Sequence, residues 1–88
     1  MSAEPVFTLC VSRVVRWEKR RLYCPTCQKS RTMLREFYEG YGWHECCLSC
    51  GEAWADGERM PRPFAPGWRQ KNIERARKRI AKYRSAVA

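Results

Sequence analysis

Two pairs of cysteines constrain this chain more than any other feature of its sequence. Cys24 and Cys27 are separated by two residues, as are Cys47 and Cys50, and nineteen residues lie between the pairs. In a tight turn, two thiolates at this spacing can take two corners of a tetrahedron around a zinc ion, with zinc–sulfur distances of about 2.3 Å. The spacing is typical of a four-cysteine zinc site. We therefore predict that these four cysteines bind one structural Zn2+, with iron as the substitute metal.

Two other cysteines and the single histidine lie outside this pattern. Cys46 precedes Cys47 on an arm that we expect to be extended, and neighbouring side chains of a strand point to opposite sides. We therefore expect Cys46 to be a small buried hydrophobic residue, while direct ligation by Cys46 or His44 remains an alternative. His44 is expected to be exposed or packed on the hairpin, and Cys10 to be a core residue of an apolar strand.

The short chain makes a stabilising metal or disulfide plausible, since its 88 residues can bury only a small core. Disulfides would require an oxidising compartment. The N-terminal segment has no basic stretch before its apolar residues, which Arg13 interrupts, and no apolar run approaches the length of a membrane span. We therefore expect a reducing cytoplasm, where paired cysteines indicate a metal.

The order of residue types predicts strands followed by a helix. Residues 6–17 are rich in β-branched and aromatic side chains and predict one strand, or two strands broken near Ser12 and Arg13. Residues 31–46 predict a hairpin with its turn at 39–42, and residues 52–58 a short third strand that closes at an Asp-Gly turn.

A proline-rich connector and a basic helix complete the chain. Residues 59–67 contain three prolines, so we expect an extended connector, with Phe64 as its candidate packing residue. From Trp68 to Ala86, apolar residues recur at steps of three and four, which predicts an amphipathic helix packed back onto the sheet. The same stripe would fit a coiled-coil seam, but two heptads are marginal. The stripe consists of Ile73, Ala76, Ile80, Tyr83 and Val87.

The segments "CPTC" at 24–27 and "CLSCG" at 47–51 resemble the zinc-ribbon family, over about residues 20 to 57. The resemblance implies a three-stranded antiparallel ribbon clamped by zinc, as in transcription and replication factors, ribosomal proteins and protein-docking modules. The expected fold is thus a small α+β, zinc-stabilised β-ribbon with N-terminal strands and a C-terminal basic helix. The expected division is a strand and ribbon region over 1–57, a connector over 58–67 and a helix over 68–88.

Charge is the main indication of function. The formal net charge is +9, of which residues 69–88 carry +7 while residues 24–57 carry −2. Such a helix favours an anionic partner, and nucleic-acid phosphates are the commonest. We expect DNA or RNA binding without base readout. The predicted phosphate contacts are Arg75, Arg77, Lys78, Arg79, Lys82 and Arg84, assisted by Arg16, Arg20 and Arg21.

Other functions receive less support from the sequence. A four-thiolate site has no open coordination position, and with one histidine nothing else assembles an active site, so we expect no catalysis. Trp17 is expected in the core rather than stacked on a base. Membrane binding is disfavoured because the helix has no large apolar block. The second hypothesis is an adaptor or inhibitor that docks on a polymerase or nuclease. Its candidate contacts are Phe37, Tyr38, Tyr41, Trp43 and Trp54.

Overall fold

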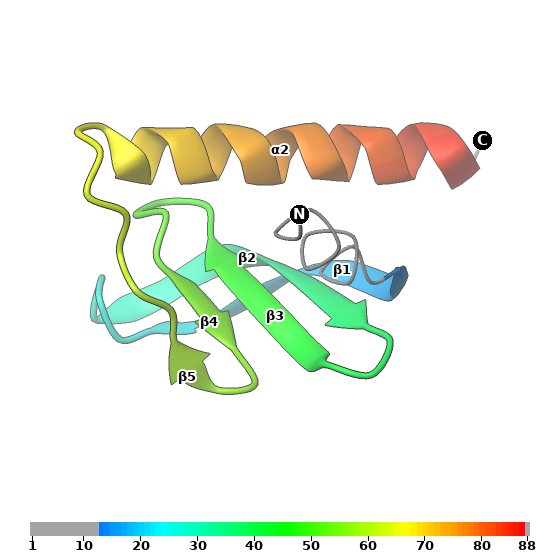
Figure 1. Cartoon of the computed structure of the whole chain (residues 1–88), viewed down its shortest axis with the longest axis horizontal. Coiled ribbons are helices and arrows are strands. Elements are labelled where there is room, and N and C mark those ends of the chain that lie inside the picture. The colour runs from blue at the N-terminus through cyan, green and yellow to red at the C-terminus, as the bar shows by residue number, and fades with distance from the viewer. Residues whose placement is uncertain (1–12, 88) are drawn as a thin grey trace, which may run out of the picture.

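The computed structural model describes residues 13–87, and their side chains as far as Ser85. It consists of a five-stranded antiparallel sheet with one long helix lying across it, as Figure 1 shows. The expected small α+β architecture is therefore confirmed. The elements are β1 (Val14–Cys24), β2 (Lys29–Tyr38), β3 (Gly42–Cys47), β4 (Ala53–Ala55), β5 (Glu58–Arg59) and α2 (Trp68–Val87).

The strands follow one another in the sheet in chain order, so that β1 and β5 are its edges. Leu34 in the middle of β2 pairs with Lys19 of β1 and with Cys46 of β3. Since alternate residues of a strand share a face, this register places Leu34, Lys19 and Cys46 on the face toward α2. Their neighbours along the strands lie on the opposite, uncovered face.

The core has a part on each face of the sheet. On the helix side, Leu34 and Cys46 pack with Ala76 and Ile80, and Trp17 joins them at the edge. On the opposite side, a second cluster contains Cys24, Met33, Cys47 and Trp54. The expected apolar stripe of the helix is thus confirmed within the described side chains, and so are the core positions of Cys46 and Trp17.

Turn chemistry explains how the strands connect. Gly40, in the turn between β2 and β3, has a φ of 84°, and the Tyr41 amide donates to the Tyr38 carbonyl across that turn. Asp56 and Gly57 both have positive φ, 54° and 86°, as a two-residue hairpin requires. The Asp-Gly turn was expected to end the sheet, but it reverses the chain into β5.

Two further expectations differ from the structure. β1 continues through the polar residues 18–23 to Cys24, because pairing with β2 along its whole length outweighs a weak strand propensity. Phe64 does not pack, since the side chain is fully exposed in the connector. Cys10 and the first part of the expected strand at 6–17 lie outside the described residues.

Candidate metal centre

The four predicted cysteines meet at one end of the sheet. Cys24 ends β1 and Cys47 ends β3, while Cys27 and Cys50 lie in the turns that follow these strands. All four sulfur atoms lie within 4.8 Å of one another. The Sγ atoms of Cys24 and Cys50 are 3.8 Å apart, and those of Cys27 and Cys47 are 4.0 Å apart.

These separations suit a metal rather than a disulfide. A disulfide joins two sulfurs at about 2.05 Å, and the described cysteines are all free. Four sulfurs at about 2.3 Å from a central ion form a tetrahedron with edges of about 3.8 Å. The four cysteines are therefore positioned to hold a metal ion.

Each pair sits in a turn with the same hydrogen bonds; we call residues 24–28 the first knuckle and residues 47–51 the second knuckle. The amide of Gln28 donates to the Cys24 carbonyl at 2.7 Å, and that of Gly51 to the Cys47 carbonyl at 2.9 Å. Gln28 and Gly51 both have positive φ, 61° and 79°. This shared conformation turns the second sulfur of each pair back toward the first.

Backbone amides also point at the sulfurs. The Cys27 amide donates to the Cys24 Sγ, and the Ser49 amide to the Cys47 Sγ, both at 3.4 Å. Donors directed at a sulfur stabilise its thiolate form, which is the form that binds metal. Each knuckle thus supplies one strand-end sulfur that is fully buried and already hydrogen-bonded.

The pKa values of the thiols indicate which cysteines carry a proton that a bound metal ion would displace. Burial raises the pKa of Cys24 and that of Cys50. At Cys27 burial also acts to raise the pKa, but hydrogen bonding from Arg31 and from the neighbouring thiols outweighs it and lowers the pKa. Metal binding therefore releases protons from this site, and acidification opposes it.

The helix is fastened directly to the second knuckle. Asn72 Nδ2 donates to the Gly51 carbonyl at 2.9 Å, and Arg69 Nη1 donates to the Cys50 carbonyl at 3.0 Å. A Cβ at Gly51 would lie 2.5 Å from the Arg69 carbonyl oxygen. Gly51 is therefore required twice, once for its φ and once because the helix backbone approaches so closely.

A buried carboxylate beside the knuckles ties three segments together. Glu52 is 1% exposed and accepts hydrogen bonds from Thr26 Oγ1 at 3.1 Å and Arg62 Nη2 at 2.8 Å. Burial acts to raise the pKa of Glu52, but the bonds from Arg62 and Thr26 prevail and lower it. Sequence reasoning missed this residue, because a glutamate beside a turn is normally exposed.

The remaining candidate ligands lie elsewhere. Cys46 faces the helix, opposite to Cys47, and burial raises its pKa to about 11, so it remains a protonated, unreactive thiol. The His44 ring packs against Tyr38 with ring centroids 4.5 Å apart. Within residues 13–87, neither side chain belongs to the sulfur cluster.

The structure does not bring the nine predicted phosphate contacts onto one surface. Arg77 and Arg84 lie on the flank of α2 that faces β1, with Lys19 across from them. Arg79 Nε instead binds the buried Glu36 at 2.9 Å, where Tyr83 also donates its hydroxyl. The other predicted helix cations, Arg75, Lys78 and Lys82, are exposed.

The three predicted strand arginines are also divided. Arg21 shares the helix-side face of β1 with Lys19, while Arg16 and Arg20 lie on the uncovered face. There the Arg16 guanidinium lies over the Phe37 ring, 5.6 Å from its centroid. No straight nucleic-acid strand could touch all nine residues at once.

Fold and site together define a small α+β domain with a cluster of four cysteines positioned to hold a metal ion, an arrangement consistent with that of a zinc ribbon. Comparison of the chain with protein-family models, curated proteins and solved structures gives no match. The helix that the structure describes is too polar to cross a membrane.

Proposed function

We propose that the four cysteines hold one zinc ion with a purely structural role. Four thiolates complete a tetrahedral shell, so the ion keeps no position for water or substrate. The ligands come from the turns that join β1 to β2 and β3 to β4. Binding of the ion therefore fixes the start of β2 and the end of β3, the two chain ends of the β2–β3 hairpin. Metal analysis of the native protein tests this, since zinc leaves it colourless whereas iron would give visible charge-transfer absorption.

We further propose that the domain binds DNA or RNA through phosphates, with no catalytic activity. One observation carries this proposal: of the eight cations of α2, only Arg69 and Arg79 form ion pairs within the described residues. The other six are exposed and form no ion pair within the described residues. A surface with so much unpaired positive charge favours phosphates, because their binding releases condensed counterions.

The metal centre supports this role by fixing the helix. Asn72 and Arg69 hold the first turns of α2 on the second knuckle, and Arg79 with Tyr83 holds its later turns on Glu36. The cations are therefore presented from a rigid support. A fixed array loses less conformational entropy on binding than a flexible basic tail.

A salt titration tests the nucleic-acid proposal. Fluorescence anisotropy with a 20-nucleotide single strand, the corresponding duplex and an RNA of the same sequence would be measured from 50 to 500 mM salt. We expect the logarithm of the affinity to fall linearly with that of salt, by about 0.7 to 0.9 per phosphate contact. Binding that does not change with salt, or no binding at 50 mM, would reject the proposal.

A protein-docking role is the second candidate, and one observation favours docking through Phe37 and Trp43. Phe37 and Trp43 pack edge to face on the uncovered side of the sheet, with ring centroids 5.3 Å apart. Tyr38, however, lies on the helix side and Trp54 is buried. The predicted aromatic residues thus do not form one patch. Loss of a captured polymerase or nuclease in a Phe37→Ala/Trp43→Ala variant, but not in helix variants, would support docking.

A further inference from the structure

We propose that the groove between α2 and the edge strand β1 is the primary phosphate site, where a nucleic-acid backbone lies against Lys19, Arg77 and Arg84. This inference rests on the proposed nucleic-acid binding and assigns it to one place. The groove has a volume of about 460 Å³ and opens beside the second knuckle. Lys19 was absent from the contacts predicted by sequence, because only folding places it opposite the helix.

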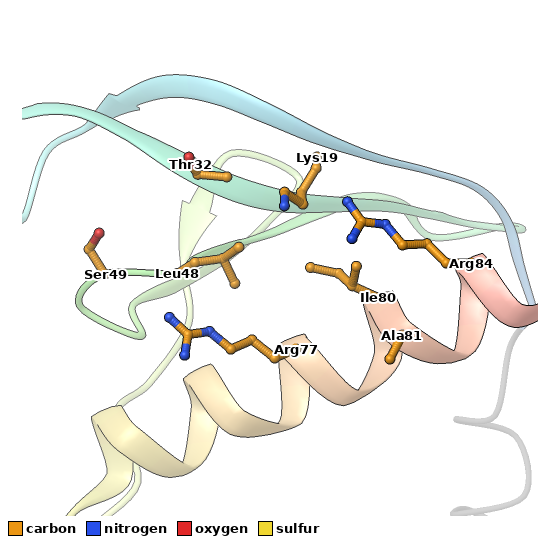
Figure 2. A pocket seen from close by; sticks show the side chains of 8 residues that line it. All are labelled: Lys19, Thr32, Leu48, Ser49, Arg77, Ile80, Ala81 and Arg84. Carbon is orange, nitrogen blue, oxygen red and sulfur yellow. The ribbon is translucent and has the colours of Figure 1, made fainter.

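The groove presents three cations from two elements. Figure 2 shows Lys19 of β1 and Arg84 of α2 at one end of the groove, with the Arg84 guanidinium extending from the helix toward the sheet. Arg77 lies further along the helix and directs its guanidinium toward the loop that carries Ser49. Arg77 and Arg84 are two helical turns apart, or about 10 Å, so the cations line a channel rather than a single point.

Nothing within residues 13–85 neutralises these cations. All six ion pairs of that part of the chain involve other arginines, and neither Lys19, Arg77 nor Arg84 takes part in one. The carboxyl end of a helix carries about half a negative charge, which opposes an anion near Arg84. Three full positive charges outweigh it, so the groove attracts anions.

The lining favours a phosphodiester over other anions. The hydroxyl-bearing residues Thr32 and Ser49 also line the groove. Such hydroxyls donate to phosphate oxygens in many nucleic-acid complexes. Leu48 and Ile80 line the apolar part of the groove, against which a sugar can lie. No aromatic ring lines it, so bases are not expected to stack there.

Two triple variants with equal charge test the location. The groove variant is Lys19→Gln/Arg77→Gln/Arg84→Gln, and the control is Lys71→Gln/Lys78→Gln/Lys82→Gln, whose residues are exposed on the side of α2 away from the buried stripe. Three lost phosphate contacts should lower the salt slope on a 20-nucleotide single strand by about 2, and the affinity at 0.1 M salt by about 100-fold. The control should lose less than about tenfold, because screening limits charges further than about 10 Å from the bound phosphates.

A second pair of variants guards against misfolding. Ala81 is exposed at the groove, so Ala81→Glu adds a negative charge there without removing a packed side chain. Ala65→Glu makes the same change in the exposed connector. We expect Ala81→Glu to weaken oligonucleotide binding at least tenfold and Ala65→Glu to leave it within twofold. Far-UV circular dichroism and zinc stoichiometry should match wild type in both variants.

The outcomes separate this inference from the broader function. If wild type binds no oligonucleotide, the proposed function fails and the inference fails with it. If wild type binds but the control triple variant loses as much affinity as the groove variant, the groove assignment alone is wrong. If polyglutamate of equal charge displaces the oligonucleotide as well as unlabelled oligonucleotide does, the groove does not select phosphate and the inference is overturned.

Discussion

The two knuckles share a backbone conformation, but α2 covers the fifth residue of the second knuckle and leaves that of the first exposed. In both, the backbone amide of the fifth residue donates a hydrogen bond to the carbonyl of the first residue, and the fifth residue has a positive φ. That residue is Gln28 in the first knuckle, where it is exposed, and Gly51 in the second, where the helix covers it. The metal geometry alone therefore tolerates a side chain at this position. Glycine is demanded only where another backbone comes within contact distance.

This difference shows how the metal centre and the helix become one unit. The first knuckle contributes ligands and, through Thr26, one hydrogen bond to Glu52. The second knuckle contributes ligands and also forms the seat of α2, through its carbonyls at Cys50 and Gly51. Disturbing the second knuckle should thus affect the basic groove, whereas the first knuckle should affect stability through the metal and the Thr26–Glu52 hydrogen bond.

Removal of the metal is expected to have the largest effect and to abolish the difference between the knuckles. Structural zinc contributes about 10–16 kcal/mol in small zinc-binding peptides, which is comparable to the whole stability of a typical domain, about 5–15 kcal/mol. A strong chelator should therefore unfold the sheet, as followed by amide chemical-shift dispersion. Acidification should favour metal release, since burial raises the pKa values of Cys24 and Cys50 and their thiols take up protons readily.

Adjacent cysteines supply the matched control for this prediction. Cys47→Ser should lose stoichiometric zinc, whereas Cys46→Ala should retain it, because Cys46 faces the helix. Retention of zinc by the Cys47 variant, or a dispersed spectrum with excess chelator, would show that the fold does not depend on the metal.

The next largest effect concerns the fifth residues of the knuckles. Gly51→Ala should lower the free energy of unfolding by about 3 kcal/mol, since a left-handed conformation costs about 1–2 kcal/mol and the new Cβ also clashes with the Arg69 carbonyl oxygen. Gln28→Gly should change it by less than about 1 kcal/mol, because relief of φ strain offsets the greater freedom of the unfolded chain. Denaturant unfolding at saturating zinc measures both, and equal losses would contradict the asymmetry.

Local spacing explains what the sequence could predict. The ligand set follows from two C-x2-C turns, the hairpin from glycines at 40 and 42, and the helix from the recurrence of Ile73, Ala76 and Ile80. Each depends on residues that are close together in the chain. Chemistry and spacing therefore predicted which four cysteines come together.

The unpredicted features all depend on distant partners. Glu36 is buried because Arg79 and Tyr83, more than forty residues later, come to it in the fold. For the same reason Arg79, expected to contact phosphate, is paired with the buried Glu36, and Lys19 lies in the groove. The number of charges on a basic helix can be read from the sequence, but which of them remain free depends on tertiary packing.

Removing a contact of the later turns of the helix should lower the free energy of unfolding by an intermediate amount. It also tests whether the second knuckle depends on the helix more than the first does. Tyr83→Phe removes the hydroxyl donor to Glu36 and should cost about 1.5–3 kcal/mol, as expected for a hydrogen bond to a charged group. Amide exchange at Gly51 should accelerate with this loss, while exchange at Gln28 should change less. An equal acceleration at both amides would indicate that the knuckles open together.

The same variant makes a prediction about pH. Burial and the neighbouring Glu36 raise the pKa of Tyr83, so its hydroxyl stays protonated in the folded state. Its stabilisation is complete below the ordinary tyrosine pKa of about 10 and is lost as pH rises toward the higher folded value. Wild type should therefore lose stability as pH rises above about 10, and Tyr83→Phe should lose less, as measured by denaturant midpoints.

The smallest effect is expected at Asn72, one of the two side chains that hold the helix on the second knuckle. Asn72→Ala removes the donor to the Gly51 carbonyl, and a neutral hydrogen bond contributes about 1 kcal/mol. Gly51 amide exchange should accelerate about fivefold, as that free energy implies, while Gln28 exchange should stay constant. Gln70→Ala is the matched control, because Gln70 bonds only to the exposed Glu74 one turn along the same helix. If Asn72→Ala leaves Gly51 exchange unchanged, the protection of the second knuckle comes from the metal alone and its seat for the helix has no energetic role.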